Sequence, residues 1–288
     1  MQIPSLATDD STPPAPLLGE TEELYLSLLK NVLTRTGFTS YSMPNPRGWR
    51  KALLGPLQVL FRAQGFEILK RGNPQKREQG LDWPVDAETM VGLKRLDNLQ
   101  HCVVQIVKAG VPGDLIETGV WRGGASIFMR AILKACNCAD RTVWVADSFK
   151  GLPKPGPLAR KGDEIFWQYP ELAVSLDLVR QNFARYQMLD DRVRFLEGWF
   201  AETLPSAPIE QLALMRLDGD MYESTKDALE ALYPKLSVGG FVIVDDYGVV
   251  DGCREAIDEF RAGQSISDEI RVIDECGIYW QRTDKQAS

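Results

Sequence analysis

The last two-thirds of the chain alternates between short apolar runs and longer amphipathic stretches. The apolar runs have the length and β-branched content of buried strands, whereas the stretches between them repeat apolar residues every three or four positions, as helices do. Strands are predicted at 114–118, 142–147, 192–197, 212–217 and 240–245. Helices are predicted at 125–135, 172–186, 223–233 and 251–262. Because strands that alternate with helices are joined by right-handed crossovers, the pattern predicts an α/β fold with a largely parallel sheet.

Two further apolar runs end the chain, at 269–274 and 277–282. A crossover between parallel strands needs about a dozen residues, and far fewer separate these runs. They must therefore pair as an antiparallel hairpin. We predict a seven-stranded, mostly parallel, Rossmann-like sheet that closes with a C-terminal antiparallel hairpin.

The first third of the chain has a different organisation. Residues 1–18 hold four prolines and no periodic pattern, which predicts a disordered tail. Residues 19–88 are predicted to form a helical, partly basic extension that begins with a helix at 20–33. A helix at 89–109 then opens the main domain, 89–288.

Within the extension, residues 47–77 carry eight basic residues and one acid, a net charge of +7 that leaves −14 for the rest of the chain. The apolar residues Trp49, Leu53, Leu54, Leu57, Leu60 and Phe61 predict an amphipathic helix, interrupted near Gly55 and Pro56. We favour a cationic helix that docks on an acidic body or covers a neighbouring subunit. Contact with a membrane surface or another anionic partner is the alternative.

Composition narrows the function classes. The 288 residues carry a net charge of −7 and a pI near 5.0, which argues against a nucleic-acid partner. Neither the roughly 18–20 apolar residues of a membrane span nor the pattern of a signal peptide is present, so we expect a cytoplasmic enzyme of small molecules. The five scattered cysteines fit reduced thiols. His101 is the only histidine, which argues against histidine-rich zinc sites and Ser-His-Asp triads.

The first candidate site is the turn ETGVWRGG at 117–124, between a predicted strand and a predicted helix. Its glycines allow close approach of a ligand, and the helix N-terminus favours an anionic group. Asp147 ends the next strand, where an acid can accept hydrogen bonds from a ribose diol. The turn is not the GxGxxG of nicotinamide cofactors and suits S-adenosylmethionine better, with Glu117 facing the cationic end of the cofactor.

A third strand is followed by Gly198, Trp199 and Phe200, at the place where an adenine ring would lie. Either aromatic side chain can pack on that ring or belong to the core. The predicted cofactor residues are therefore Glu117, Thr118, Gly119, Val120, Gly123, Asp147, Ser148, Gly198 and Trp199.

Four acids form the second candidate site. Asp218 and Asp220 follow the fourth predicted strand, and Asp245 and Asp246 end the fifth. The carboxyl ends of parallel strands share one edge of the sheet, and carboxylates crowded there repel one another unless a cation binds. Asp218, Asp245 and Asp246 are predicted to hold Mg²⁺, which would help an acceptor hydroxyl to lose its proton. The alternative for Asp220 and the YEST stretch after it is capping of the next helix.

A long connection, 150–171, with four prolines lies between two of the predicted elements. Connections of this length in a compact domain are commonly functional covers, so the segment is a candidate lid. Its aromatic residues Phe166, Trp167 and Tyr169 can close over a substrate or pack at a dimer contact.

Five motifs together resemble the macrocin O-methyltransferase family, whose members methylate sugar hydroxyls of natural products. They are LIETGVWRGG, DSFKGLP, GWF, RLDGDMYEST and GGFVIVDDY, within roughly residues 89–282. The resemblance implies a class I methyltransferase fold, S-adenosylmethionine, Mg²⁺ and a homodimer. It carries the cofactor role to Glu117, Gly119, Asp147, Ser148 and Trp199, and the metal role to Asp218, Asp245 and Asp246.

The catalytic base differs from that of related enzymes. Catechol methyltransferases of similar fold have a lysine three residues after the first metal aspartate, and here that position is Met221. Asp218 is therefore the predicted catalytic base.

The resulting hypothesis is a Mg²⁺-dependent O-methyltransferase of a glycosylated small molecule, acting on one hydroxyl of a vicinal diol. The rival is a non-catalytic nucleotide-fold protein that uses segment 47–77 for membrane or partner contact.

Overall fold

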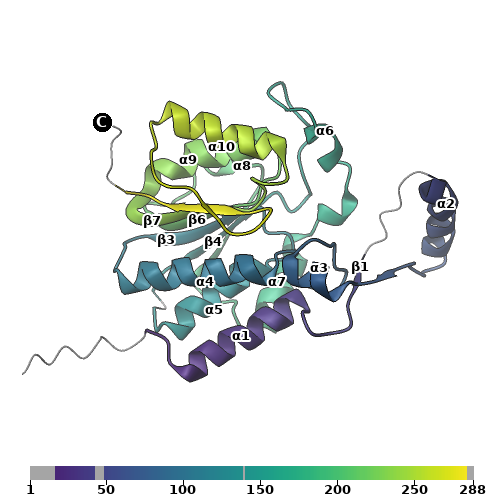
Figure 1. Ribbon diagram of the computed structural model, residues 1–288, viewed down its shortest axis with the longest axis horizontal. Helices are drawn as coiled ribbons and strands as arrows, with labels where there is room; N and C mark the ends of the chain where they lie inside the picture. The colour runs from purple at the N-terminus through teal and green to yellow at the C-terminus, as the bar shows by residue number, and fades with distance from the viewer. Residues whose placement is uncertain (1–16, 43–48, 139, 284–288) are drawn as a thin grey trace, which may run out of the picture.

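The computed structural model describes residues 17–42, 49–138 and 140–283, and for 49–53 it describes the backbone alone. Most of the predicted N-terminal tail, residues 1–16, lies outside these ranges. A central sheet is covered by helices on both faces, and an arm from the N-terminal extension projects beyond them (Figure 1). None of the helices in the described ranges is both long enough and apolar enough to cross a bilayer.

The central sheet has seven strands in the order β5-β4-β3-β6-β7-β9-β8. The strands are β3 (Asp114–Thr118), β4 (Val143–Asp147), β5 (Val193–Glu197), β6 (Leu212–Leu217), β7 (Leu236–Val244), β8 (Arg271–Val272) and β9 (Ile278–Gln281). Pairs from β5 through β7 are parallel, whereas β9 pairs antiparallel with both β7 and β8. The predicted seven-stranded sheet with its terminal hairpin is confirmed.

The chain runs from β3 outward to β5 and then returns to the other side of β3 with β6. This reversal opens a crevice at the carboxyl ends of β3 and β6, where ligands bind in open α/β sheets. Successive side chains of β3 point to opposite faces, so Leu115 and Ile116 enter two different cores.

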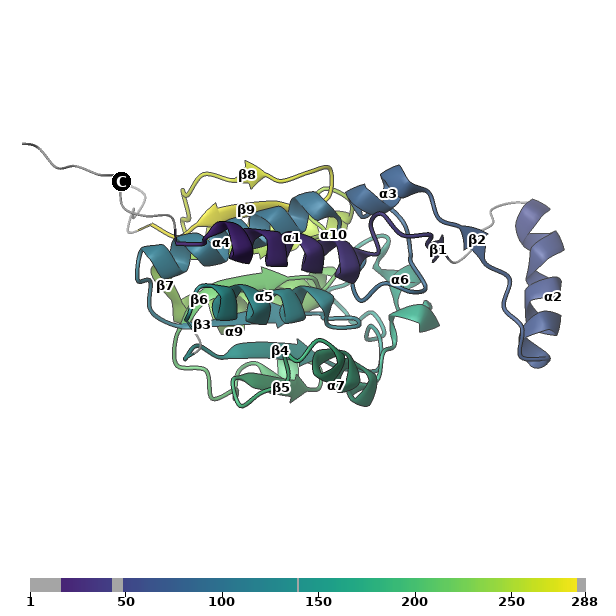
Figure 2. The ribbon, with the colours of Figure 1, turned by 90° about the horizontal axis from the view of Figure 1, so that it is seen from below.

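Two layers of helices cover these cores. One face carries α1 (Glu20–Thr34), α4 (Leu93–Lys108), α5 (Gly124–Ala135) and α7 (Leu176–Arg185), and the other carries α8 (Phe200–Thr203), α9 (Tyr222–Leu232), η2 (Tyr233–Lys235) and α10 (Asp251–Gly263) (Figure 2). The connection between β4 and α7 contains α6 (Asp163–Phe166) and η1 (Pro170–Leu172).

Two helices begin later than the pattern predicts. Helix α4 starts at Leu93 instead of residue 89, because its N-cap Gly92 is extended and the guanidinium of buried Arg77 binds the carbonyls of Met90 and Val91. Helix α7 starts at Leu176, where the Ser175 side chain accepts a hydrogen bond from the third helical residue and caps the helix. In both cases a side-chain hydrogen bond fixes the boundary.

The N-terminal arm consists of a ribbon and a helix. Strands β1 (Tyr41–Ser42) and β2 (Lys70–Arg71) pair antiparallel, α2 (Trp49–Ala63) stands beyond them, and α3 (Pro74–Gln79) leads back to the body (Figures 1 and 2). The predicted interruption of α2 at Pro56 is wrong, since the helix continues through it. The preceding Gly55 has no Cβ to clash with the proline ring.

Candidate functional site

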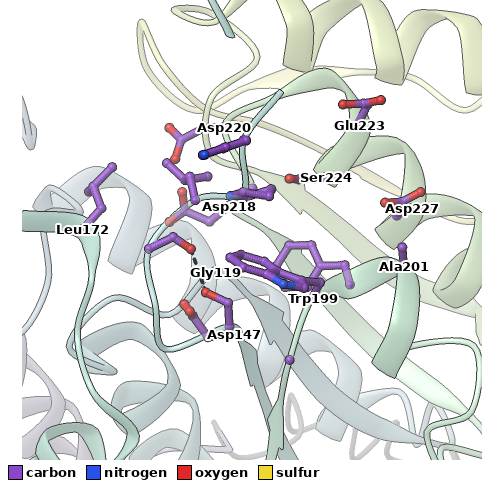
Figure 3. Close-up of a pocket in the computed structure, with 18 of the residues that line it drawn as sticks. Gly119, Asp147, Leu172, Trp199, Ala201, Asp218, Asp220, Glu223, Ser224 and Asp227 are labelled. Atoms are coloured by element: carbon purple, nitrogen blue, oxygen red, sulfur yellow. Dashed lines mark hydrogen bonds between the residues drawn. The ribbon is translucent and has the colours of Figure 1, made fainter. Parts of the chain in front are cut away.

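A cavity of about 310 Å³ opens at the carboxyl ends of β3, β4, β5 and β6 (Figure 3). Its volume lies at the lower end of the usual range for small-molecule sites, roughly 300–1,000 Å³. Five of the predicted cofactor residues line it: Gly119, Asp147, Ser148, Gly198 and Trp199. Asp218 and Asp220, from the predicted acid site, line the same cavity. The cofactor site and the acid site therefore meet in one space, although Asp245 and Asp246 do not line it themselves.

Asp147 is held in place by backbone amides. One carboxylate oxygen accepts from the Val120 N–H at 2.8 Å and the other from the Phe149 N–H at 2.7 Å. Burial raises the pKa of Asp147, while these backbone hydrogen bonds oppose that rise. Each carboxylate oxygen can accept more than one hydrogen bond, and Asp147 lines the cavity, so it can also accept from a ligand diol.

Four predicted cofactor residues do not line the cavity: Glu117, Thr118, Val120 and Gly123. Glu117 is 2% exposed and accepts hydrogen bonds from Ser126 on α5 and from Arg216, the latter at 2.7 Å. Burial raises its pKa to about 7, against the opposing effects of Arg216 and Ser126. A direct contact between Glu117 and the cofactor stays a prediction, because both of its oxygens already have partners within the protein.

Gly119 brings the two ends of the cavity together. Its φ of +81° favours glycine, and a Cβ built there would lie 1.7 Å from the carbonyl oxygen of Asp218. Any side chain would therefore push β3 away from the turn after β6. This glycine fixes the distance between the cofactor end and the acidic end.

The three predicted metal ligands come together at the ends of β6 and β7. Asp218, Asp245 and Asp246 each offer a carboxylate oxygen, and these oxygens lie within 4.8 Å of one another. Three hard oxygen donors on two adjacent strands suit Mg²⁺, which prefers carboxylates and keeps several waters. The donor set therefore fits a divalent cation.

Two arginines that the sequence analysis missed also lie among these acids. Arg216, 2% exposed, donates to Glu117 and to Asp218 at 2.7 and 2.8 Å, and it also contacts Asp245. Arg95 of α4 binds the other oxygen of Asp245 and pairs with Asp274 at 3.1 Å. The repulsion expected among the acids is thus already reduced by two cations of the chain.

The strand register explains the position of Arg216. Arg216 lies opposite Glu117 in the parallel pairing of β3 and β6, on the same side of the sheet. Burial alone would lower the pKa of Arg216, but Asp245, Asp218 and Glu117 together raise it well above its usual value. The residue stays charged within the core. Arg95, by contrast, reaches the site from a helix, and nothing in its local pattern indicates this.

Asp220 is a free carboxyl group in the cavity. In the described part of the chain its carboxylate takes part in no ion pair. The N-cap of α9 is Met221, whose side chain makes no capping hydrogen bond. The capping alternative for Asp220 is therefore wrong. Burial raises its pKa well above the usual value, and the charges of Asp218 and Asp245 add to that rise.

The candidate lid forms one wall of the cavity through Gly151, Leu152, Pro153, Lys154, Gly156 and Leu158. Glu223 of α9 fixes this wall, because its carboxylate accepts from the N–H groups of Gly156 and Leu158 at 2.6 and 3.0 Å. The aromatic residues proposed to close the site do not line it. Tyr169 instead packs edge-to-face on Trp83, with ring centroids 4.9 Å apart.

Comparison with known proteins agrees with this geometry. The macrocin-O-methyltransferase (TylF) family profile matches residues 22–282. The chain belongs to this family. The family places it among the S-adenosylmethionine-dependent O-methyltransferases, and both the predicted family and the predicted enzyme class are confirmed.

Two relatives and one solved structure illustrate the similarity. A demethyldecarbamoylnovobiocin O-methyltransferase of Streptomyces niveus is 56% identical over 210 residues, 72% of this chain and 80% of that protein. An 8-demethyl-8-(2,3-dimethoxy-alpha-L-rhamnosyl)-tetracenomycin-C 4'-O-methyltransferase of Streptomyces olivaceus is 49% identical over 267 residues, 92% and 94% of the two chains. The structure of the O-methyltransferase NovP matches with a TM-score of 0.79 and 47% identity, and covers 91% of this chain and 99% of that one.

Proposed function

We propose that the protein transfers a methyl group from S-adenosylmethionine to a sugar hydroxyl of a small glycosylated natural product, assisted by Mg²⁺. The observation that supports this most directly is the shared cavity, in which Asp147 and Trp199 lie at one end and Asp218 and Asp220 at the other. A methyl donor and a hydroxyl acceptor bound at these two ends would meet within a single space.

At the cofactor end, the carboxylate of Asp147 would accept hydrogen bonds from the ribose hydroxyls. Trp199 and Phe200 line the cavity beside Gly198 and offer flat apolar surfaces to the adenine. The side chain of Ser148 holds the carbonyl of Gly151 at 2.6 Å and so keeps the adjoining wall close. These residues would orient the donor without taking part in bond formation.

At the acidic end, Asp218, Asp245 and Asp246 would hold the cation. Bound there, a divalent cation would polarise the acceptor oxygen and fix its position. With S-adenosylmethionine bound, the acceptor oxygen would form a bond to the methyl carbon as the carbon–sulfur bond breaks, and the electron pair of that bond would stay on sulfur. The hydroxyl proton passes to a carboxylate of the chain.

Two carboxylates are candidates for that proton. Asp218 is the residue proposed from the sequence, but it already contacts Arg216 and belongs to the metal set. Asp220 lines the cavity outside both, and burial raises its pKa above the usual value of an aspartate, which is the direction that favours proton uptake. Metal affinity separates the two. Asp218→Asn should lower both turnover and Mg²⁺ affinity, whereas Asp220→Asn should lower turnover alone if Asp220 is the base.

The acceptor is proposed to carry a second oxygen on the carbon next to the methylated hydroxyl, as in a vicinal diol. Two neighbouring oxygens can share one cation and fix which of them reacts. The name of the tetracenomycin relative places methoxy groups at sugar positions 2 and 3 of an acceptor methylated at 4'. The test therefore includes acceptors with a neighbouring ether oxygen as well as acceptors with a free diol.

The test is a methylation screen of glycosides that carry a vicinal diol, the matching monomethyl ether or the matching deoxy sugar, with Mg²⁺ or with EDTA. We expect diols to react, deoxy sugars to react least, and EDTA to abolish turnover. Asp246→Asn should lower kcat/KM by about 100-fold and weaken Mg²⁺ binding, with affinity for S-adenosylmethionine unchanged. Asp251→Asn, an acid whose side chain is 76% exposed on α10, is the control. Full turnover after exhaustive EDTA treatment would exclude the role of the cation.

We further propose that the protein is a cytoplasmic homodimer with no nucleic-acid partner. The acidic net charge of −7 supports the last point. Neither the location nor the oligomeric state follows from the methyl transfer itself, and each needs its own measurement.

A further inference from the structure

The arm helix α2 has no core of its own. None of the described α2 side chains is buried, and Leu57, Leu60 and Phe61 are 41%, 58% and 42% exposed. Phe66, 63% exposed, follows the helix and packs edge-to-face on Phe61 at 6.5 Å. We call Leu57, Leu60, Phe61 and Phe66 the arm patch. Residues 57, 60 and 61 share one face of the helix.

A helix with this composition needs a partner. An isolated helix of about 15 residues is marginal in water even when it is rich in alanine, and α2 contains both Gly55 and Pro56. Contacts with its own body are few, and the ion pair from Arg62 to Glu171 spans 3.9 Å on the surface. Burial of the arm patch against another surface would supply the missing stabilisation.

Helix α1 carries a matching exposed surface. Leu26, Leu29 and Leu33 face the core, whereas Leu24 and Leu28, one turn apart on the opposite face, are 61% and 57% exposed. Leu17 precedes the helix, two residues before its N-cap Gly19, and is 38% exposed. We call Leu17, Leu24 and Leu28 the α1 stripe.

The two surfaces are opposite in charge. Helix α1 has Glu20, Glu22 and Glu23 in its first turn, whereas α2 has no acid in its first turn and Arg62 in its last. Segment 47–77 as a whole is +7 against −14 for the rest of the chain. A basic apolar helix and an acidic apolar helix of 15 residues each are therefore complementary in charge, character and length.

The α1 stripe of the same chain is out of reach in this arrangement. Both views place α2 beyond the β1–β2 ribbon, on the far side from α1 (Figures 1 and 2). We infer that the arm patch of one copy docks on the α1 stripe of a second copy, and that the second copy returns the same contact. Two-fold symmetry lets this single contact cover both exposed surfaces on both chains. A membrane surface would cover the arm patch and leave the α1 stripe in water.

The experiment uses the full chain and measures mass by sedimentation velocity across a concentration series. Wild type should be a dimer. Leu60→Asp in the arm patch and Leu28→Asp in the α1 stripe should each raise the dissociation constant by about 100-fold or more, because every dimer contains the altered contact twice. Val59→Asp is the matched control, since Val59 is 70% exposed on another face of the same helix. Far-ultraviolet circular dichroism reports whether each variant remains folded.

Mixing the two monomeric variants provides a second, sharper readout. A mixed pair keeps one intact contact, from the unaltered arm of Leu28→Asp to the unaltered α1 stripe of Leu60→Asp, so the mixture should form dimers that neither variant forms alone. A monomeric wild type, a dimer that neither substitution weakens, or a dimer weakened by Leu60→Asp alone would each overturn the inference. Co-sedimentation of wild type with phosphatidylserine vesicles, lost in Leu60→Asp and kept in Leu28→Asp, would assign the arm to membranes instead. Because association is read by mass and not by turnover, failure here is distinct from failure of the proposed methyl transfer.

Discussion

Replacement of Arg216 by methionine tests the arginine at the centre of the acids. The substitution keeps an unbranched side chain and removes the charge that faces Glu117, Asp218 and Asp245. The side chains of Glu117 and Asp245 are only 2% and 8% exposed, so water cannot take over the lost contacts. Removal of one partner of a buried ion pair costs about 3–5 kcal/mol, and we expect the free energy of unfolding to fall by that amount at pH 8.

Urea unfolding followed by circular dichroism measures the loss. With a slope of about 3 kcal/mol per molar, the midpoint should fall by about 1–2 M. The loss should be smaller at pH 5 than at pH 8. Without Arg216 the folded-state pKa of Glu117 rises further above its unfolded value. Protonation of Glu117 therefore stabilises the folded variant at low pH, and this stabilisation is lost as the pH rises. Both measurements are made in EDTA.

Arg271→Met is the control, since Arg271 pairs with Glu269 at 3.2 Å on the surface, where both side chains are more than half exposed. Surface pairs contribute about 0–1 kcal/mol, so this variant should unfold almost as the wild type does. If Arg216→Met does not fold, Glu117→Gln removes one charge of the same network and should cost about 1–3 kcal/mol. A loss below about 1 kcal/mol for Arg216→Met at pH 8 would refute the view that this arginine stabilises the site.

Three further predictions concern the turn, the wall and the thiols. Gly119→Ala should lower the free energy of unfolding by about 2–5 kcal/mol, as a thermal melt would report, and should weaken cofactor binding. Gly110→Ala is the control, because Gly110 has a φ of +63° and no atom lies within 4 Å of the added Cβ, and it should lower the free energy of unfolding by only about 1 kcal/mol. Glu223→Ala removes the hydrogen bonds that hold the cavity wall at 156–158, so it should raise KM for the acceptor and leave the cofactor Kd unchanged in calorimetry. An equal weakening of acceptor and cofactor binding would contradict this. Cys136, whose pKa burial raises to about 11, and buried Cys102 should resist iodoacetamide at pH 8 until urea is added, as mass spectrometry would report.

Local sequence patterns were sufficient to predict the sheet and most of the residues that meet at the cavity. Strand β3 has the predicted bounds, 114–118, because its apolar centre, Leu115 and Ile116, lies in a short segment between Gly113 and Gly119. The acids after β6 and β7 come together because parallel strands place their carboxyl ends at one edge. Helix boundaries fared less well, because the contacts of Arg77 and the cap at Ser175 lie outside any apolar period.

Residues that act across large sequence separations escaped the sequence analysis. Arg95 lies 150 positions before Asp245, in a helix whose pattern indicates only packing. The inward orientation of Glu117 depends on its register with β6, which no single segment encodes. Trp83 likewise meets Tyr169 through tertiary packing alone. Pairing of this kind becomes visible only once the strand order is known.

The arginines beside the acids bear on the order in which the protein is assembled. In small zinc domains the ligand cluster has no internal counter-charge, and the chain stays unfolded until metal arrives. Here Arg95 and Arg216 neutralise part of the cluster from within, so the chain can complete its fold before any ion is bound. Binding of the proposed Mg²⁺ would then be a late and reversible step that follows the supply of free cation, and folding of the newly made protein would not depend on it.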